Sequence, residues 1–216
     1  SIGARKGARP IVTNPWVTKV DEPVHEEVHE VAPLERSFIS TGPTDPQAGV
    51  RTLGSGLPVR QEPGVPGAVW VVGAHGGAGE SRIAALADNW VASDHTWPGP
   101  LHEGSVPALL VARTHMDGLK AARVCATQWA AGVVPHVRLL GLVLVADASG
   151  RMPRVLRDFA GVVEGGVPRV WRAPWVESWR LGEATSLETA PRALRFMVDE
   201  VYELSQVSAT EAREER

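Results

Sequence analysis

Residues 69–81 read VWVVGAHGGAGES, an apolar run followed by a loop rich in glycine. The apolar run predicts a buried strand, and the recurrence of Ile83, Leu86, Ala87 and Trp90 predicts a helix of about three turns behind the loop. Glycine lets a backbone take positive φ and approach a ligand with no Cβ in the way. Successive N–H groups of such a turn and the N-terminus of the next helix form a site for an anion.

The loop matches the phosphate-binding motif GxxxxGK[ST] only in part. Ala74 stands at the first glycine of the motif, and Glu80 stands where the motif has lysine. That lysine neutralises the β- and γ-phosphates of a nucleotide, whereas a carboxylate repels them. Lysine is absent between Lys19 and Lys120, and Arg82 is expected to point elsewhere on its helix. If the loop is a decayed phosphate site, Glu80→Lys should restore nucleotide affinity.

Residues 75–81, HGGAGES, are similar to the variant KGGxGK[ST] of the ParA/MinD partition ATPases, with both lysines replaced. Three later segments also resemble parts of that family. Residues 109–115 are similar to its strand after the Walker B region, and residues 140–147 to its strand near the base-binding asparagine. Residues 170–175 are similar to its strand and loop close to the adenine. The resemblance covers residues 67–205 and is closest to a small actinobacterial group of ParA-like P-loop proteins. It implies ATP and Mg²⁺ as ligands.

The resemblance weakens where that family places its catalytic carboxylates. Residues 91–106 form a segment too short for the two strands that would carry the Mg²⁺-binding and water-positioning acids. Asp147 falls at the base-binding position, while Asp94 and Glu103 lie in the short segment. Loss of a lysine and an acid removes the charge stabilisation on which phosphoryl transfer depends. We therefore interpret the chain as a non-hydrolysing binding or assembly module with no catalytic residue.

The candidate binding residues form two groups. One group would hold phosphate, and it consists of Gly73, His75, Gly76, Gly77, Ala78, Gly79, Glu80, Ser81 and Arg82. The other group would contact a base or a partner protein, because tryptophan stacks on rings and is frequent at interaction hot spots. That group consists of Asp147, Trp175 and Trp179. We expect Trp171 to fill the core instead, and no metal ligand is assigned.

His75 lies where the partition ATPases place the lysine that reaches the phosphates of a dimer partner. A protonated histidine could replace that lysine weakly at low pH. Paired with Glu80, it would instead fill the phosphate site with an internal ion pair. The partner that we expect is another protein or a second copy of the chain.

Two alternatives use the same loop. In the first, the chain binds ATP or GTP, or hydrolyses them slowly, and Arg82 or a partner's residue supplies the missing charge. In the second, Gly73, Gly76 and Gly79 form the GxxGxxG turn of an NAD(P)-binding Rossmann protein, with Asp94 near the ribose. No second strand is evident before Asp94, and the chain lacks the YxxxK motif of short-chain dehydrogenases, so we rank this alternative last.

The composition of the chain limits the classes of protein to which it can belong. The chain has 216 residues, a formal net charge of -3 and one cysteine. These values predict one globular domain with appendages and give no basic excess for nucleic acid. A single cysteine excludes an internal disulfide and fits a reducing cytoplasm. No membrane span or signal peptide is visible, and the arginine-, alanine- and glycine-rich composition indicates a GC-rich genome such as that of an actinobacterium.

The chain divides near residue 66. Nine of the 17 prolines fall in residues 1–66, which predicts an extended and partly disordered arm. Residues 14–17 (NPWV) and 56–59 (GLPV) would anchor this arm on a partner or on the domain. Residues 25–29, HEEVH, match the zinc-protease motif HExxH, but we interpret the match as chance because it lies outside any predicted core.

Strands and helices alternate from residue 67 onward. This order favours an α/β domain over residues 67–205, with a mostly parallel sheet flanked by helices in three layers, like a reduced P-loop NTPase or Rossmannoid domain. Residues 206–216 would be a charged tail. The further strands are predicted at 107–112, 137–146 and 167–171, and the further helices at 114–132, 153–163 and 191–205.

Overall fold

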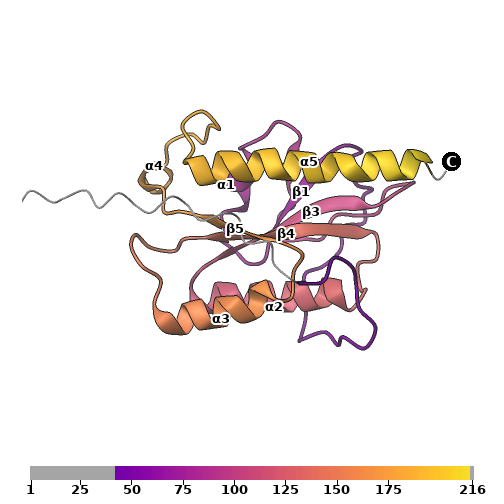
Figure 1. The fold of residues 1–216 in the computed structure, drawn as a ribbon, viewed down its shortest axis with the longest axis horizontal. Helices are drawn as coiled ribbons and strands as arrows, with labels where there is room; N and C mark the ends of the chain where they lie inside the picture. Colours follow the sequence, from indigo (N-terminus) through magenta and orange to yellow (C-terminus); the bar gives the residue numbers. More distant parts are fainter. Residues whose placement is uncertain (1–41, 215–216) are drawn as a thin grey trace, which may run out of the picture. The chain divides into compact units, whose positions relative to one another are not determined.

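A five-stranded parallel sheet forms the centre of the structure, a computed structural model that describes residues 42–214 (Figure 1). The strands lie in the order β2-β1-β3-β4-β5, and every neighbouring pair is parallel. Their bounds are β1 Val69–Gly73, β2 Trp90–Ala92, β3 Val106–Arg113, β4 Val137–Val145 and β5 Val170–Ala173. The predicted α/β class with a parallel sheet is confirmed.

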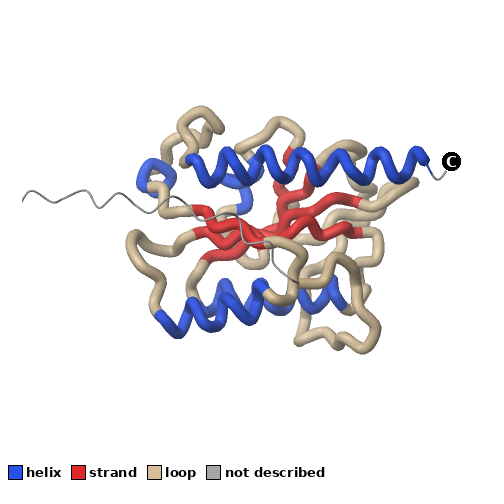
Figure 2. The backbone as a smooth tube through the Cα atoms, viewed as in Figure 1, coloured by secondary structure: helices blue, strands red, loops and turns tan. Residues whose placement is uncertain are grey.

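Helices cover both faces of the sheet, which completes three layers (Figure 2). The helices α1 and α5 pack on one face, and α2 and α3 pack on the other. A short helix, α4, follows β5. The bounds are α1 Glu80–Ala84, α2 Met116–Ala130, α3 Arg154–Glu164, α4 Glu177–Arg180 and α5 Arg192–Glu214. None of the helices in the described part of the chain is both long and apolar enough to span a membrane.

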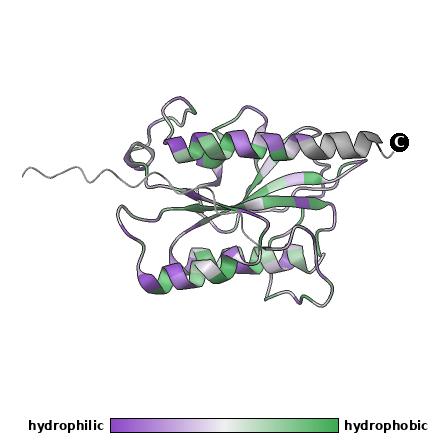
Figure 3. Ribbon diagram, viewed as in Figure 1, coloured by the Kyte–Doolittle hydropathy of each residue, from purple (hydrophilic) through white to green (hydrophobic). Residues whose placement is uncertain are grey.

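The strands are apolar on both faces because both faces are covered (Figure 3). In β1, Val69 and Val71 pack toward α1 and α5, whereas Trp70 and Val72 pack toward α2 and α3. This alternation follows from the two-residue period of a strand. Each fully buried side chain of this size contributes about 1.5–3 kcal/mol of transfer free energy. Burial on both faces therefore explains the near-continuous apolar runs in the sequence.

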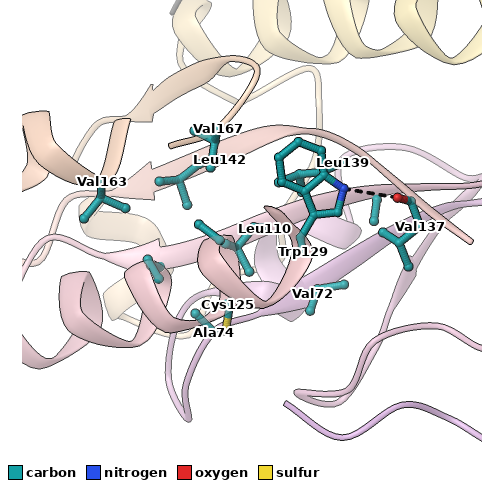
Figure 4. Close-up of a cluster of buried hydrophobic side chains, with 14 of the residues drawn as sticks. Val72, Ala74, Leu110, Cys125, Trp129, Val137, Leu139, Leu142, Val163 and Val167 are labelled. Carbon is teal, nitrogen blue, oxygen red and sulfur yellow. Dashed lines mark hydrogen bonds between the residues drawn. The ribbon is translucent and has the colours of Figure 1, made fainter. Parts of the chain in front are cut away.

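The core beneath α2 contains the one cysteine of the chain (Figure 4). Trp129 is buried there, and its Nε1–H donates a hydrogen bond to the carbonyl oxygen of Val137 at 3.2 Å. Cys125 lies on the same helix and is 2% exposed. Its burial raises the pKa of the thiol to about 12.

We expect the Cys125 thiol to react at least about 1000-fold more slowly with an aromatic disulfide reagent in the folded protein than in denaturing urea at about pH 8. The thiolate is the reactive form, and the raised pKa leaves very little of it. Burial also excludes the reagent. Stopped-flow absorbance measures both rates, and similar rates in the two states would mean that α2 opens readily from the sheet.

Most predicted elements are confirmed to within three residues at each end, but the segment after the glycine loop differs. The predicted three-turn helix is wrong: α1 ends at Ala84, and Trp90 begins strand β2. Ile83, Leu86 and Trp90 nevertheless all pack in the core beneath α5. A short helix, a turn and a strand that face one core reproduce the apolar spacing of a longer helix. In addition, α5 extends nine residues past its predicted end at residue 205.

Residues 42–66 contain no helix or named strand, yet part of this segment packs on the domain. Gln128 on α2 accepts a hydrogen bond from the N–H of Leu57 at 2.9 Å and donates one to its carbonyl oxygen at 2.8 Å. Val59 forms a parallel bridge with Trp97. The anchor predicted at residues 56–59 therefore docks on the domain. The predicted anchor at 14–17 and the HEEVH segment at 25–29 lie outside the described residues.

Candidate ligand-binding site

The strand order creates a switch point at the carboxyl ends of β1 and β3. The chain leaves β1 for β2 on one side, and β3, β4 and β5 follow on the other. Ligands of open α/β sheets bind in the crevice at such a point. The glycine loop follows β1 there, and Gly77 and Gly79 have φ values of 78° and 98°. Glycine is therefore required at both positions for the conformation of the loop.

Glu80 ties the glycine loop to the turn after β2. Its side chain is 6% exposed, and its Oε2 lies 3.0 Å from Nδ1 of His95. The N–H groups of Ser93 and His95 donate to its carboxylate at 2.5 and 3.4 Å. A Cβ atom at Gly73 would lie 2.6 Å from Glu80 Oε2, so glycine leaves room for this carboxylate. None of the hydrogen bonds of Glu80 goes to an N–H group of the loop.

The turn that Glu80 holds has two successive residues in the left-handed conformation. Asp94 and His95 have φ values of 53° and 55°. Such a conformation costs about 1–3 kcal/mol for each non-glycine residue and persists only where its surroundings hold it. Because the Glu80 carboxylate binds N–H groups of this turn, it offsets part of that cost. Glu80 thus has a structural role that its place in the motif did not suggest.

The expectation of no second strand before Asp94 is wrong. The strand β2 ends at Ala92 and pairs with β1. The sequence pattern did not reveal this strand, because its apolar residues continue the helical spacing of the residues before it. The Asp94 side chain is 89% exposed and lies 3.4 Å from Nη2 of Arg60, so this acid does not face the glycine loop.

His75 does not form the predicted ion pair with Glu80. Its Nδ1–H donates to the carbonyl oxygen of Gly76 at 2.8 Å, and its Nε2 accepts from the N–H of Arg113 at 3.2 Å. The ring is therefore neutral. Burial is the main cause that lowers the pKa of His75, and the nearby His115 and His95 lower it further. Glu80 is held on the β2 side, and this physically separates the two expected partners.

Arg113 is the residue that sequence reasoning missed. It ends β3, and its Nε donates to the carbonyl oxygen of Gly77 at 3.3 Å. Its Nη1 donates to the carbonyl oxygen of Ala146 at 2.9 Å, just after β4. Arg113 is distant from the loop in sequence and reaches it across the sheet, so it is not among the lysines and sequence neighbours that could replace the motif lysine. The sequence does contain one signal for this role, namely an arginine at the end of an otherwise apolar predicted strand.

Arg82 points away from the glycine loop, as expected. Its guanidinium donates to the carbonyl oxygens of Trp179, at 3.2 Å, and of Glu183. It also donates to Oγ1 of Thr185 at 3.3 Å. Arg82 therefore connects α1 to α4 and to the segment after it.

A pocket of about 120 Å³ lies at the carboxyl ends of β4 and β5, beside the start of α1. Four predicted candidates line it, together with two arginines that were not predicted. These six residues are Gly79, Arg82, Trp175, Trp179, Arg113 and Arg180. None of the residues that line this pocket is acidic. The pocket thus combines positive charge with aromatic walls.

The other candidates do not line this pocket. Gly76, Gly77 and Ser81 are exposed, Ala78 is fully buried, and Gly73, His75 and Glu80 make the contacts described above. Asp147 is also exposed, and its backbone N–H donates to Oγ1 of Thr114 at 3.0 Å. Trp171 is 4% exposed and donates from Nε1 to Glu200 at 2.8 Å, which confirms its predicted core position.

Residues 67–198 match the model of a family of unknown function, DUF6668. The chain belongs to this family. No curated protein and no solved structure matches it. The DUF6668 segment begins just before β1 and ends within α5. It therefore includes the whole sheet, the glycine loop and every residue named in the pocket.

We expect the free energy of unfolding of this DUF6668 protein to decrease as the pH falls below about 6.5. The pKa of His75 is lower in the folded state than its usual 6.5, so the unfolded chain binds this proton more readily. The contribution of neutral His75 is complete above the unfolded pKa and is lost as the pH falls toward the folded pKa.

Urea unfolding at about pH 8 and about pH 5.5 measures this effect. The control is His75→Gln, because an amide can donate to Gly76 and accept from Arg113 without titrating. The decrease in stability on acidification should be smaller in this variant than in the original protein. An equal decrease in the two proteins would assign the pH dependence to other groups.

Proposed function

We propose that this DUF6668 protein is a ParA/MinD-like P-loop module that binds or assembles with a partner and does not hydrolyse nucleotides. The observation that carries the proposal is the buried Glu80 carboxylate at the position of the motif lysine. This carboxylate makes three contacts with Ser93 and His95, which give it a structural role. The proposal includes a cytoplasmic location, which the single free cysteine supports.

The charge at this position opposes phosphate binding. Two like charges about 4 Å apart repel by about 4 kcal/mol at an effective dielectric constant of about 20. In P-loop enzymes the lysine at this position supplies attraction of the same origin. Replacement of lysine by glutamate therefore reverses an interaction that nucleotide hydrolysis needs. The hydrogen bonds from Ser93 and His95 hold the carboxylate between Gly73 and the turn after β2.

The surroundings of the pocket also favour a module without hydrolytic activity. Mg²⁺ prefers carboxylate and water ligands, and phosphoryl transfer needs the metal to neutralise developing charge. No acidic residue lines the pocket, and the side chain of Asp94 points to solvent. Asp147, the other candidate acid, is exposed outside the pocket. These positions support binding without catalysis.

Calorimetry with Mg·ATP and Mg·GTP, combined with an assay of phosphate release, tests the proposal. We expect no phosphate release above the buffer rate, and no saturable heat at ligand concentrations of about 1 mM. Glu80→Gln removes the negative charge but adds no lysine, so this control should also fail to hydrolyse ATP. Tight binding of Mg·ATP with turnover by the original protein would refute the proposal.

One observation supports the alternative that the protein binds a dinucleotide. The strand β2 lies beside β1 and ends directly before the turn that contains Asp94, where Rossmann proteins place a ribose-binding acid. NAD and NADP in the same calorimetric series test this alternative. Saturable binding of either cofactor that is lost in Asp94→Asn would favour it over the P-loop module.

The partner of the module is proposed to be another protein or a second copy of the chain. Leu181, directly after α4, is 70% exposed close to the pocket residue Trp179, which gives apolar surface for a contact. Light scattering after gel filtration measures the mass in solution. A dimer that Leu181→Asp converts to a monomer would identify the second copy as partner, and a monomer in both would leave another protein as the partner.

A further inference from the structure

Two of the pocket arginines have no acidic partner among the residues that the structure describes. Arg82 and Arg113 are partly buried, and the hydrogen bonds of their guanidinium groups go to carbonyl or hydroxyl oxygens. Neither forms an ion pair with an acidic residue in the described part of the chain. Both line the same pocket. The protein therefore places two positive charges at one wall without compensating them.

These contacts leave donors available for a ligand. Arg113 uses Nε and Nη1, so its Nη2 has no partner among residues 42–206. Arg82 uses Nη1 and Nη2, which leaves its Nε. Arg180 adds a third charge, and its only ion pair within the described part of the chain is a 3.5 Å contact with Glu177. Guanidinium groups are planar forks that match the oxygens of phosphate and carboxylate.

The carbonyl contacts also preorganise the two guanidinium groups. Two nitrogens of the Arg113 guanidinium group are held, Nε by Gly77 in the loop and Nη1 by Ala146 after β4. Arg82 is held by Trp179 in α4 and by Glu183 in the segment that follows it. Side chains that are already ordered lose little conformational entropy when a ligand binds. A partly desolvated cation without a counter-ion is unfavourable, and an anion in the pocket would relieve that cost.

The size and walls of the pocket narrow the ligand class. Its volume of about 120 Å³ is well below the roughly 300 Å³ at which pockets begin to hold drug-sized molecules. It therefore suits one small charged group and not a whole nucleotide. Trp175 and Trp179 line the same space, and the Trp175 indole is held by a 2.6 Å hydrogen bond to Glu177. The tryptophans provide flat apolar surface beside the charges.

We propose that this pocket binds a phosphate group, with Arg82, Arg113 and Arg180 supplying the charge and Trp175 and Trp179 flanking the part to which the phosphate is attached. The site adjoins the glycine loop at Gly79, but its charge comes from arginines on β3, α1 and α4. The inference goes beyond the proposed function, since it names a ligand and requires neither nucleotide binding nor catalysis.

Nuclear magnetic resonance of the tryptophan indole N–H groups tests the proposal on the full chain, with inorganic phosphate as the probe. The variants Trp175→Phe and Trp179→Phe assign the two relevant signals. We expect saturable shifts of these two signals and none of the buried Trp97 and Trp129. Arg180→Glu should weaken binding by about tenfold, because it reverses a charge at the pocket.

The matched control is Arg123→Glu, which makes the same charge change on an exposed residue of α2, on the other face of the sheet. Its effect on affinity should be less than about twofold, because salt screens distant surface charges. Arg113→Gln should abolish binding, and its urea unfolding curve shows whether the variant is folded. Arg180→Glu provides the test independently, since Arg180 is exposed and outside the core.

Phenyl phosphate in a second titration distinguishes two sources of the same chemistry. Tighter binding of phenyl phosphate than of inorganic phosphate would assign the site to a phosphate ester with a flat group, and equal binding would assign it to free phosphate. No saturable shift with either probe would overturn the proposal, as would equal weakening by Arg180→Glu and Arg123→Glu. Failure here leaves the proposed function intact, whereas ATP turnover refutes that function whatever this titration shows.

Discussion

Replacing Glu80 by lysine is expected to destabilise the domain by about 3–5 kcal/mol or to unfold it. The motif alone predicts the opposite, namely recovery of nucleotide binding. The buried carboxylate accepts hydrogen bonds from Ser93 and His95 and pairs with the His95 ring. Lysine has donors only, so both N–H groups would lose their acceptor and an ammonium group would face His95 in place of the carboxylate.

Urea unfolding of Glu80→Lys, Glu80→Gln and the original protein measures this effect. Glutamine keeps one acceptor oxygen and should cost about 1–2 kcal/mol. Glu188→Lys is the matched control, because Glu188 is exposed and should change stability by less than about 0.5 kcal/mol. A Glu80→Lys protein that unfolds at the original urea concentration and binds Mg·ATP would contradict the structural role of Glu80.

Replacing Trp97 by alanine is expected to lower the free energy of unfolding by about 3–5 kcal/mol. Trp97 is completely buried and packs in the core beneath α2. Its Nε1–H donates to Oε1 of Gln128 at 2.7 Å. Its backbone N–H donates to the carbonyl of Pro58, and its carbonyl accepts from the N–H of Arg60. The residue therefore joins the segment before β1 to the sheet.

Trp97→Phe separates packing from hydrogen bonding in this region. Phenylalanine keeps most of the apolar contact, and Oε1 of Gln128 still accepts from the N–H of Leu57, so we expect a loss of about 1–2 kcal/mol. Trp175→Ala, at a partly exposed tryptophan outside the core, should cost less than about 1 kcal/mol. If Trp97→Ala were no more destabilising than Trp175→Ala, the segment that contains residues 57–60 would not be part of the folded domain.

The parallel sheet and most of its helices could be predicted because their signals are local and repeated. The apolar runs of β3 and β4 are long enough to exclude other structures, and the apolar face of α2 recurs over four turns. The signal failed at Trp90, where a three-residue strand continued the helical spacing of its neighbours. Short elements that share one core face are not separable by periodicity.

The glycines of the loop, its place after a buried strand and the glutamate at the lysine position can all be read from residues 69–81. The partners of that glutamate cannot, because Ser93 and His95 reach it through a strand that local patterns did not reveal. Arg113 reaches Gly77 across 36 positions of sequence. Charge pairing depends on distance in space and on burial, and the packing of β2 and β3 against β1 sets both.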